Sequence, residues 1–107
     1  MKKLTSSQSK YLRGLAHNLK PVVFVGQKGV TTALLKSIDE AFERHELIKV
    51  KFIDFKEKEQ KKNIAATIEN KTNSQMAGMI GHIAIFYKQH RDPDKRKILL
   101  PKNPPQD

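Results

Sequence analysis

A short apolar run that stops at a glycine and gives way to a helical pattern constrains this chain more than any other feature. Residues 21–25 read PVVFV, and such a β-branched run after a proline predicts a buried strand. The next four residues, GQKG at 26–29, predict a loop, and from Thr31 onward apolar residues recur at helical spacing. Strand, glycine-bounded loop and helix in direct succession indicate an α/β fold.

The segment before this unit predicts an amphipathic helix over residues 4–17. Thr5 and Gln8 lie three apart, which is the spacing of a capping box at a helix start. The helical projection separates an apolar face from a basic one. The apolar face holds Tyr11, Leu12, Leu15 and Ala16, and the basic face holds Lys10, Arg13 and His17.

The rest of the chain predicts further strands and one more helix. The expected strands are 47–54, 74–80 and 83–88, the expected helix is 56–71, and Gly81-His82 suits a type II′ turn. The order helix, strand, helix, strand, helix, strand, strand implies a compact α/β domain with a mixed four-stranded sheet packed with helices. We expect one domain over residues 1–101 and a flexible tail over 102–107, with most of the segment after residue 88 extended.

Side-chain patterns assign most large residues to the core or the surface. Four aromatic residues fall at core-like positions, so no aromatic platform for stacking bases is expected: Phe24, Phe42, Phe52 and Phe86. His45 falls on the apolar stripe of the second helix and should be packed. The lysines at the start of the third helix alternate with glutamates and should be solvated: Lys56, Lys58, Lys61 and Lys62.

The charge of the chain points to an anionic partner. Its formal net charge is +10 over 107 residues. The segment up to Asp54 has ten basic and five acidic residues and the segment beyond it has eleven and six, so each half carries +5. An excess spread over a folded domain suits contact with a polyanion, because every neutralised phosphate releases a counterion.

Several kinds of chemistry find no support in the sequence. The chain has no cysteine, and its four histidines show no metal-ligand spacing, so we expect no disulfide, no metal and no cofactor. No nucleophile has a base near it in sequence, and we do not expect an enzyme. Neither a membrane span nor a signal peptide is recognisable, and we expect a cytoplasmic monomer with no membrane partner.

The sequence of the GQKG loop allows two interpretations, a phosphate-binding loop and a plain turn. Glycines let the backbone turn sharply, the following helix directs free N–H groups toward the loop, and Lys28 adds a charge, which together favour a bound phosphate. A plain turn between strand and helix would look the same. The spacing alone is weak, because Gly78 and Gly81 repeat it within an apolar strand. No Walker lysine follows Gly29, so a mononucleotide site is not indicated.

The segments LRGLAHNLKPVVFVGQKGVT, HELIKVK, IGHIAIFYK and DKRKILLP together resemble the CRM domain (chloroplast RNA splicing and ribosome maturation), in its stand-alone bacterial form, YhbY. The match runs in order from about Leu4 to Pro101. The resemblance implies a fold similar to the C-terminal domain of initiation factor three. It also implies RNA binding that involves the G-x-x-G loop and an association with ribosomal RNA in precursors of the large ribosomal subunit.

Carried over by position, the resemblance assigns RNA contacts to the loop, to the helix cap after it and to the first helix. These residues are Gly26, Gln27, Lys28, Gly29, Thr31, Arg13 and His17, and the charges of Lys10 and Lys20 are expected to add to the field. Many family members have an arginine where this chain has Lys88, so a planar bidentate donor is missing there. The favoured hypothesis is a ribosome-assembly protein that contacts the sugar-phosphate backbone. The alternative is a basic protein-interaction module that docks on an acidic ribosomal or assembly partner.

Overall fold

The computed structural model describes residues 3–101, and its elements follow the order expected from the sequence. The helices are α1 (Ser6–Ala16), α2 (Thr32–Arg44) and α3 (Lys58–Thr72), and the strands are β1 (Val23–Val25), β2 (Leu47–Phe52), β3 (Gln75–Ile80) and β4 (Ile83–Tyr87). A short 3₁₀ helix, η1 (Pro93–Lys95), follows the last strand. The expected division at residue 101 leaves the predicted tail, 102–107, outside the described residues. No helix within residues 3–101 is long and apolar enough to cross a membrane.

The four strands form one mixed sheet in the order β1-β2-β4-β3. β1 pairs with β2 in parallel, and the other two pairings are antiparallel. β1 and β3 are therefore the edge strands. Ile80 and Ile83 are register partners, which leaves two residues for the turn between β3 and β4. Gly81 has a φ of +59° and His82 does not have a positive φ, as the expected type II′ turn requires.

Local sequence signals explain where the helices begin and end. Thr5 accepts a hydrogen bond from the backbone N–H of Gln8, and the Gln8 side chain accepts one from the N–H of Thr5, so the expected capping box is present. Thr31 caps α2 in the same position, with its hydroxyl accepting from the N–H of Leu34. Asn73, in the left-handed conformation, ends α3.

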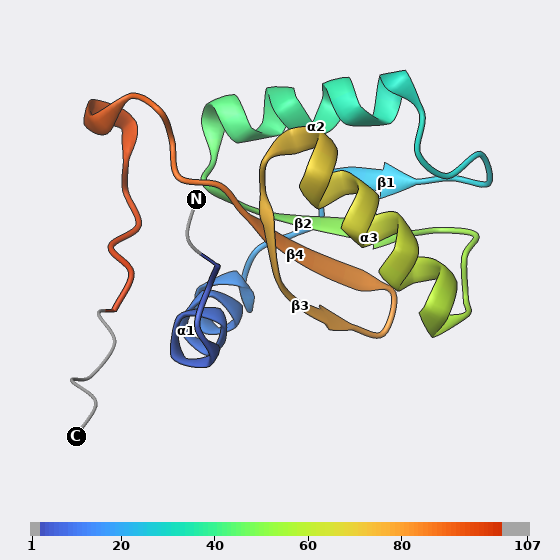
Figure 1. Ribbon diagram of the computed structural model, residues 1–107, viewed down its shortest axis with the longest axis horizontal. Coiled ribbons are helices and arrows are strands. Elements are labelled where there is room, and N and C mark those ends of the chain that lie inside the picture. Colours follow the sequence, from blue (N-terminus) through green and yellow to red (C-terminus); the bar gives the residue numbers. More distant parts are fainter. Residues whose placement is uncertain (1–2, 102–107) are drawn as a thin grey trace.

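Two apolar clusters lie on the two faces of the sheet. Helices α2 and α3 cover one face (Figure 1), and the larger cluster there includes Val25, Ile38, Val50, Ile68 and Phe86. Helix α1 covers the other face, where a smaller cluster consists of Leu12, Ala16, Leu47, Ala77, Ile85 and Tyr87. Burying both faces of the central strands accounts for the near-continuous apolar character of residues 83–87.

The chain after β4 is extended, as expected, but it is attached to the domain. The buried carboxylate of Glu46 accepts hydrogen bonds from the backbone N–H groups of His90 (2.8 Å), Lys97 (2.7 Å) and Ile98 (2.9 Å). Burial raises the pKa of Glu46, but these three donors, together with the charge of His90, outweigh burial and lower the pKa below its ordinary value. Ile98 and Leu100 pack against the α1 cluster.

Five residues lie elsewhere than the sequence predicts. Phe24 is 55% exposed, because β1 is an edge strand and α1 does not reach it. Tyr11 and Leu15, expected on a buried face of α1, are 43% and 41% exposed. His45 is exposed at the end of α2 rather than packed in the core.

The fifth of these residues is Lys61, which is buried rather than solvated. Its Nζ donates a hydrogen bond to the Gly81 carbonyl oxygen at 2.6 Å and lies 3.4 Å from Nδ1 of His82. The lysine therefore fixes the β3-β4 turn to α3. The neighbouring lysines, Lys56, Lys58 and Lys62, are exposed as expected.

Candidate functional site

The GQKG loop is a tight turn that leads from β1 into α2. The N–H of Gly29 donates to the carbonyl oxygen of Gly26 at 3.0 Å, which closes the turn. Gly29 has a φ of +66°, a conformation that strains any residue with a side chain. Gln27 and Lys28, at the tip, are exposed. The loop is therefore a turn, as one of the two interpretations predicts. Lys28 at its tip remains exposed to a ligand.

The surroundings of the two glycines differ. A Cβ added to Gly29 would lie 3.5 Å from the ring of Phe55, so that side of the glycine faces the protein itself. A Cβ added to Gly26 would meet only a carboxylate oxygen of Asp54, at 3.9 Å. Gly29 is therefore required for its backbone conformation rather than for space. Asp54 introduces one negative charge next to the loop.

The start of α2 offers hydrogen-bond donors beside the loop. Thr31 satisfies the N–H of Leu34, whereas the N–H groups of Thr32 and Ala33 have no hydrogen-bond partner among residues 3–101. The first turn of α2 contains no acidic residue. Free amides and the positive end of the helix dipole make such a terminus favourable for an anion.

A hollow of about 560 Å³ lies along β1, the loop and the first turns of α2. Its lining joins the apolar residues of the edge strand to the loop and the helix start, and includes Phe24, Gly26, Lys28, Thr31 and Ser37. An extended chain could therefore approach the loop and the exposed ring of Phe24 from the same side.

The candidate residues of α1 lie elsewhere. Lys10, Lys20 and His17 are exposed. Arg13 is half-buried: its guanidinium donates to the Ala77 carbonyl oxygen at 2.9 Å, and its stem lies against Gly78 of β3. Arg13 is thus partly committed to holding α1 on the sheet, whereas the other three are available for contact.

The predicted residues therefore form two groups. Figure 1 shows α1 at one end of the sheet, while the loop between β1 and α2 extends past the opposite end. Lys88 belongs to neither group: its Nζ lies 6.0 Å from the centre of the Phe42 ring on α2. Sequence reasoning missed what lies between the groups, namely Phe24 and its register partner Lys51 on the α1 side of the sheet.

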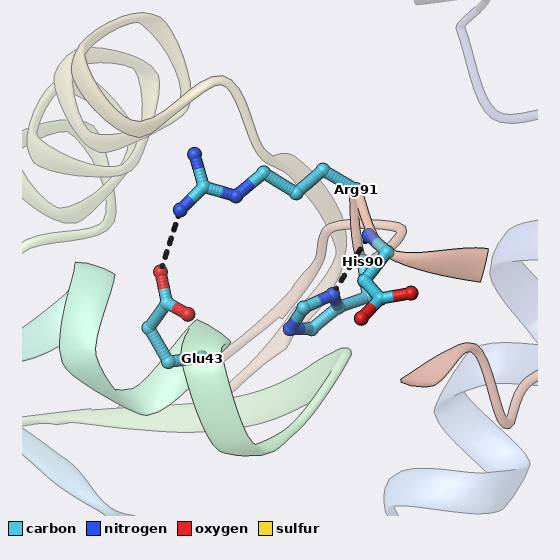
Figure 2. Close-up of polar contacts among 4 residues, drawn as sticks. Glu43, His90 and Arg91 are labelled. Atoms are coloured by element: carbon cyan, nitrogen blue, oxygen red, sulfur yellow. Dashed lines mark hydrogen bonds and ion pairs between the residues drawn. The ribbon is translucent and has the colours of Figure 1, made fainter. Parts of the chain in front are cut away.

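Several other titratable residues of the part described lie at the surface of α2 and η1. Figure 2 shows Arg91 reaching Glu43 of α2, with the closest nitrogen and oxygen 3.6 Å apart and both side chains exposed, and His90 Nδ1 accepting from the N–H of Asp92. Among residues 3–101, no cluster of acidic and histidine side chains could hold a metal ion. Glu40 and Glu43 are exposed on α2, and Asp92 and Asp94 are exposed at η1, as expected of surface residues.

Comparison with known proteins agrees with this architecture. Residues 4–88 match the CRS1 / YhbY (CRM) domain. An RNA-binding protein of Haemophilus influenzae is 39% identical over 102 residues, which cover 95% of this chain and 99% of the relative. The probable RNA-binding protein YqeI of Bacillus subtilis is 37% identical over 98 residues, covering 92% and 99%.

A solved structure shows the same fold. The solution structure of SAV1595 from Staphylococcus aureus, described as a candidate RNA-binding protein, aligns with a TM-score of 0.78 and 34% identity, covering 92% of this chain and 99% of that one. None of these names refers to a catalytic activity. With the fold, the loop and the sequence match over residues 4–88 in agreement, the chain belongs to the CRS1/YhbY (CRM) domain family.

Proposed function

We propose that this protein binds RNA, without catalysis, through contacts that are mainly to the sugar-phosphate backbone. The observation that carries the proposal is the turn at 26–29: an exposed Lys28 precedes the start of α2, where the amides of Thr32 and Ala33 have no partner among residues 3–101, and Lys28, Thr31 and Ala33 border a hollow. The net charge of +10 and the RNA-binding descriptions of the relatives support it.

In this proposal the parts of the site have separate roles. The amides of Thr32 and Ala33 bond a phosphate, Thr31 holds the helix start in place, and Lys28 supplies a mobile charge. Lys10 and Lys20 extend the positive field, with Arg13 at its inner edge, and the exposed His17 adds a hydrogen-bonding side chain. Contacts of this kind position RNA and add affinity but carry little base information, so the shape of the RNA provides most of the selectivity.

Reversing one loop charge tests the site. Lys28→Glu should weaken binding about tenfold and reduce the slope of log affinity against log salt by about one, because one phosphate contact is lost. The melting temperature should stay unchanged, since Lys28 is exposed and no described residue depends on it. Lys62→Glu, an exposed position on α3, is the charge-matched control. Equal affinities for the two variants would remove the loop from the binding site.

We further propose that the RNA is ribosomal, in precursors of the large subunit, as the family resemblance implies. Crosslinking in cells followed by sequencing should recover mainly large-subunit ribosomal RNA. Pull-downs before and after RNase digestion address the alternative, a basic module that docks on an acidic protein. A partner that stays bound after digestion would favour the alternative over the proposal.

A further inference from the structure

The sheet face that carries α1 is covered only in part. Four side chains lie in register across all four strands on this face: Phe24 of β1 pairs with Lys51 of β2, Lys51 with Ile83 of β4, and Ile83 with Ile80 of β3. We call these four residues the open row. Phe24 is 55% and Ile80 65% exposed, Lys51 is exposed, and Ile83 is half-buried.

The end of α1 sets the boundary of the open row. The neighbouring register row on this face contains Lys49, Ile85 and Gly78, and α1 reaches it at both sides. Arg13 lies against Gly78, and Lys49 Nζ donates to the carbonyl oxygen of His17 at 3.3 Å. Figure 1 shows α1 at this end only, with the turn after β3 and the loop after β1 at the other. The open row thus lies between the α1 group and the GQKG loop.

We propose that the open row is a binding surface for unpaired nucleotides, with a base stacked on the ring of Phe24. This inference rests on the proposed RNA binding and names the form of RNA that the site takes. Register partners on neighbouring strands lie about 4.8 Å apart, so the row spans roughly 14 Å, which is room for about two or three nucleotides. Ile80 and Ile83 offer apolar contact to further bases, and Lys51 meets the phosphates.

The composition of the row favours RNA over a protein partner. One of its two inner members is Lys51, Lys49 lies in the adjacent row, and neither row contains an acidic residue. A protein that docked on the apolar side chains would have to bury the charge of Lys51 among them. The surface of four side chains is also much smaller than the roughly 800 Å² that each partner buries in a typical stable protein interface.

The row is continuous with the loop. Phe24 lies two residues before Gly26, and both line the hollow that also contains Lys28. A single strand whose phosphate rests at the start of α2 can therefore pass its next bases over the exposed ring. Duplex RNA keeps its bases paired and stacked inside the helix, so it can use the loop but not the ring. The open row therefore selects single-stranded segments.

Phe24 variants test the inference against matched RNA probes. The probes are an unstructured ten-nucleotide RNA and a ten-base-pair RNA duplex, with the wild-type chain and Phe24→Leu and Phe24→Tyr compared by fluorescence anisotropy. Phe24→Leu should bind the single strand about tenfold more weakly and the duplex within about twofold of the wild type. Phe24→Tyr keeps the ring and should bind both probes normally. Lys51→Gln should lower the salt slope for the single strand by about one.

A direct readout comes from the absence of tryptophan in the chain. Phe24→Trp introduces the only indole, and stacking of a base should quench its emission as single-stranded RNA is added. If Lys28→Glu weakens binding but Phe24→Leu does not and the emission stays unchanged, the open row is overturned while the proposed function stands. If the wild type is a dimer by sedimentation and Phe24→Leu a monomer, the row is a self-association surface and the inference is wrong. If the wild-type chain binds neither probe, the proposed function itself fails.

Discussion

The two faces of the sheet are covered to different extents. On one face, α2 and α3 enclose a cluster that extends over all four strands, from Val25 on β1 to Met76 and Met79 on β3. On the other face, α1 and the chain after β4 enclose a smaller cluster and leave the open row in solvent. Apolar packing stabilises the first face, whereas hydrogen bonds to the backbone attach α1 and the chain after β4 to the second face. One small sheet can therefore keep the residues that stabilise the fold on one face and leave residues of the other face exposed for binding.

The strongest test of this comparison applies one substitution to both faces. Phe86 is fully buried under α2 and α3, so Phe86→Ala should lower the free energy of unfolding by about 3–5 kcal/mol. Phe24→Ala on the open row should change the unfolding free energy by less than about 0.5 kcal/mol. Urea denaturation measures both, and Phe86→Leu gives a smaller loss if the alanine variant does not fold. Similar losses at the two positions would show that the faces are not distinct.

Removing the charge of Glu46 should have the next largest effect. Glu46→Gln replaces one carboxylate oxygen with an amide nitrogen, so at least one of the N–H groups of His90, Lys97 and Ile98 loses its acceptor. We expect a loss of about 1–3 kcal/mol by urea unfolding. Hydrogen exchange at Lys97 and Ile98 should accelerate. Glu40→Gln on the exposed side of α2 is the control, and equal stability of the two variants would contradict the anchoring role.

The same carboxylate should make the α1 face sensitive to acid. The pKa of Glu46 is lower in the folded protein than its ordinary value of 4.5, so the unfolded chain binds the proton more readily. The stabilisation is complete above the ordinary pKa and is lost as the pH falls through the lower, folded value. Between pH 6 and pH 3 the wild type should therefore lose more unfolding free energy than Glu46→Gln does. Parallel pH profiles would assign the acid sensitivity to other groups.

A smaller effect is expected where α1 meets β3. A Cβ on Gly78 would lie 2.5 Å from Cδ of Arg13, so Gly78→Ala must displace the arginine and break its bond to the Ala77 carbonyl oxygen. We expect a loss of about 1 kcal/mol. The same substitution in an Arg13→Ala background should cost clearly less, and a double-mutant cycle measures the difference. Additive losses would mean that the two residues do not constrain each other.

Much of this arrangement could be predicted from local signals. The capping box at Thr5, the cap at Thr31, the alternation of residues 47–52 and the turn at Gly81 each depend on neighbours in sequence, and the structure confirms them. They determine element type and order. The match to the CRM domain over residues 4–88 confirms the family resemblance, whereas the likeness to the C-terminal domain of initiation factor three stays a prediction.

The errors all concern contacts between distant segments. Phe24 lies in an apolar run, and only the length and position of α1 decide that its ring stays exposed. Lys61 is buried because a carbonyl oxygen 20 residues away accepts a hydrogen bond from its Nζ, and the partners of Glu46 lie 44 to 52 residues away. Periodicity describes which face of an element is apolar, but it does not say which part of that face a neighbour covers.

The anchoring at Glu46 has a consequence for the basic segment that follows β4. Each of its three hydrogen bonds goes to a main-chain N–H, so these bonds do not depend on the identity of the side chains at positions 90, 97 and 98. Lys95 and Lys97 are exposed and need not serve in attachment. Any residue except proline could occupy position 97 and keep its bond, so the outward charges of the segment can change to suit different polyanions without refolding the domain.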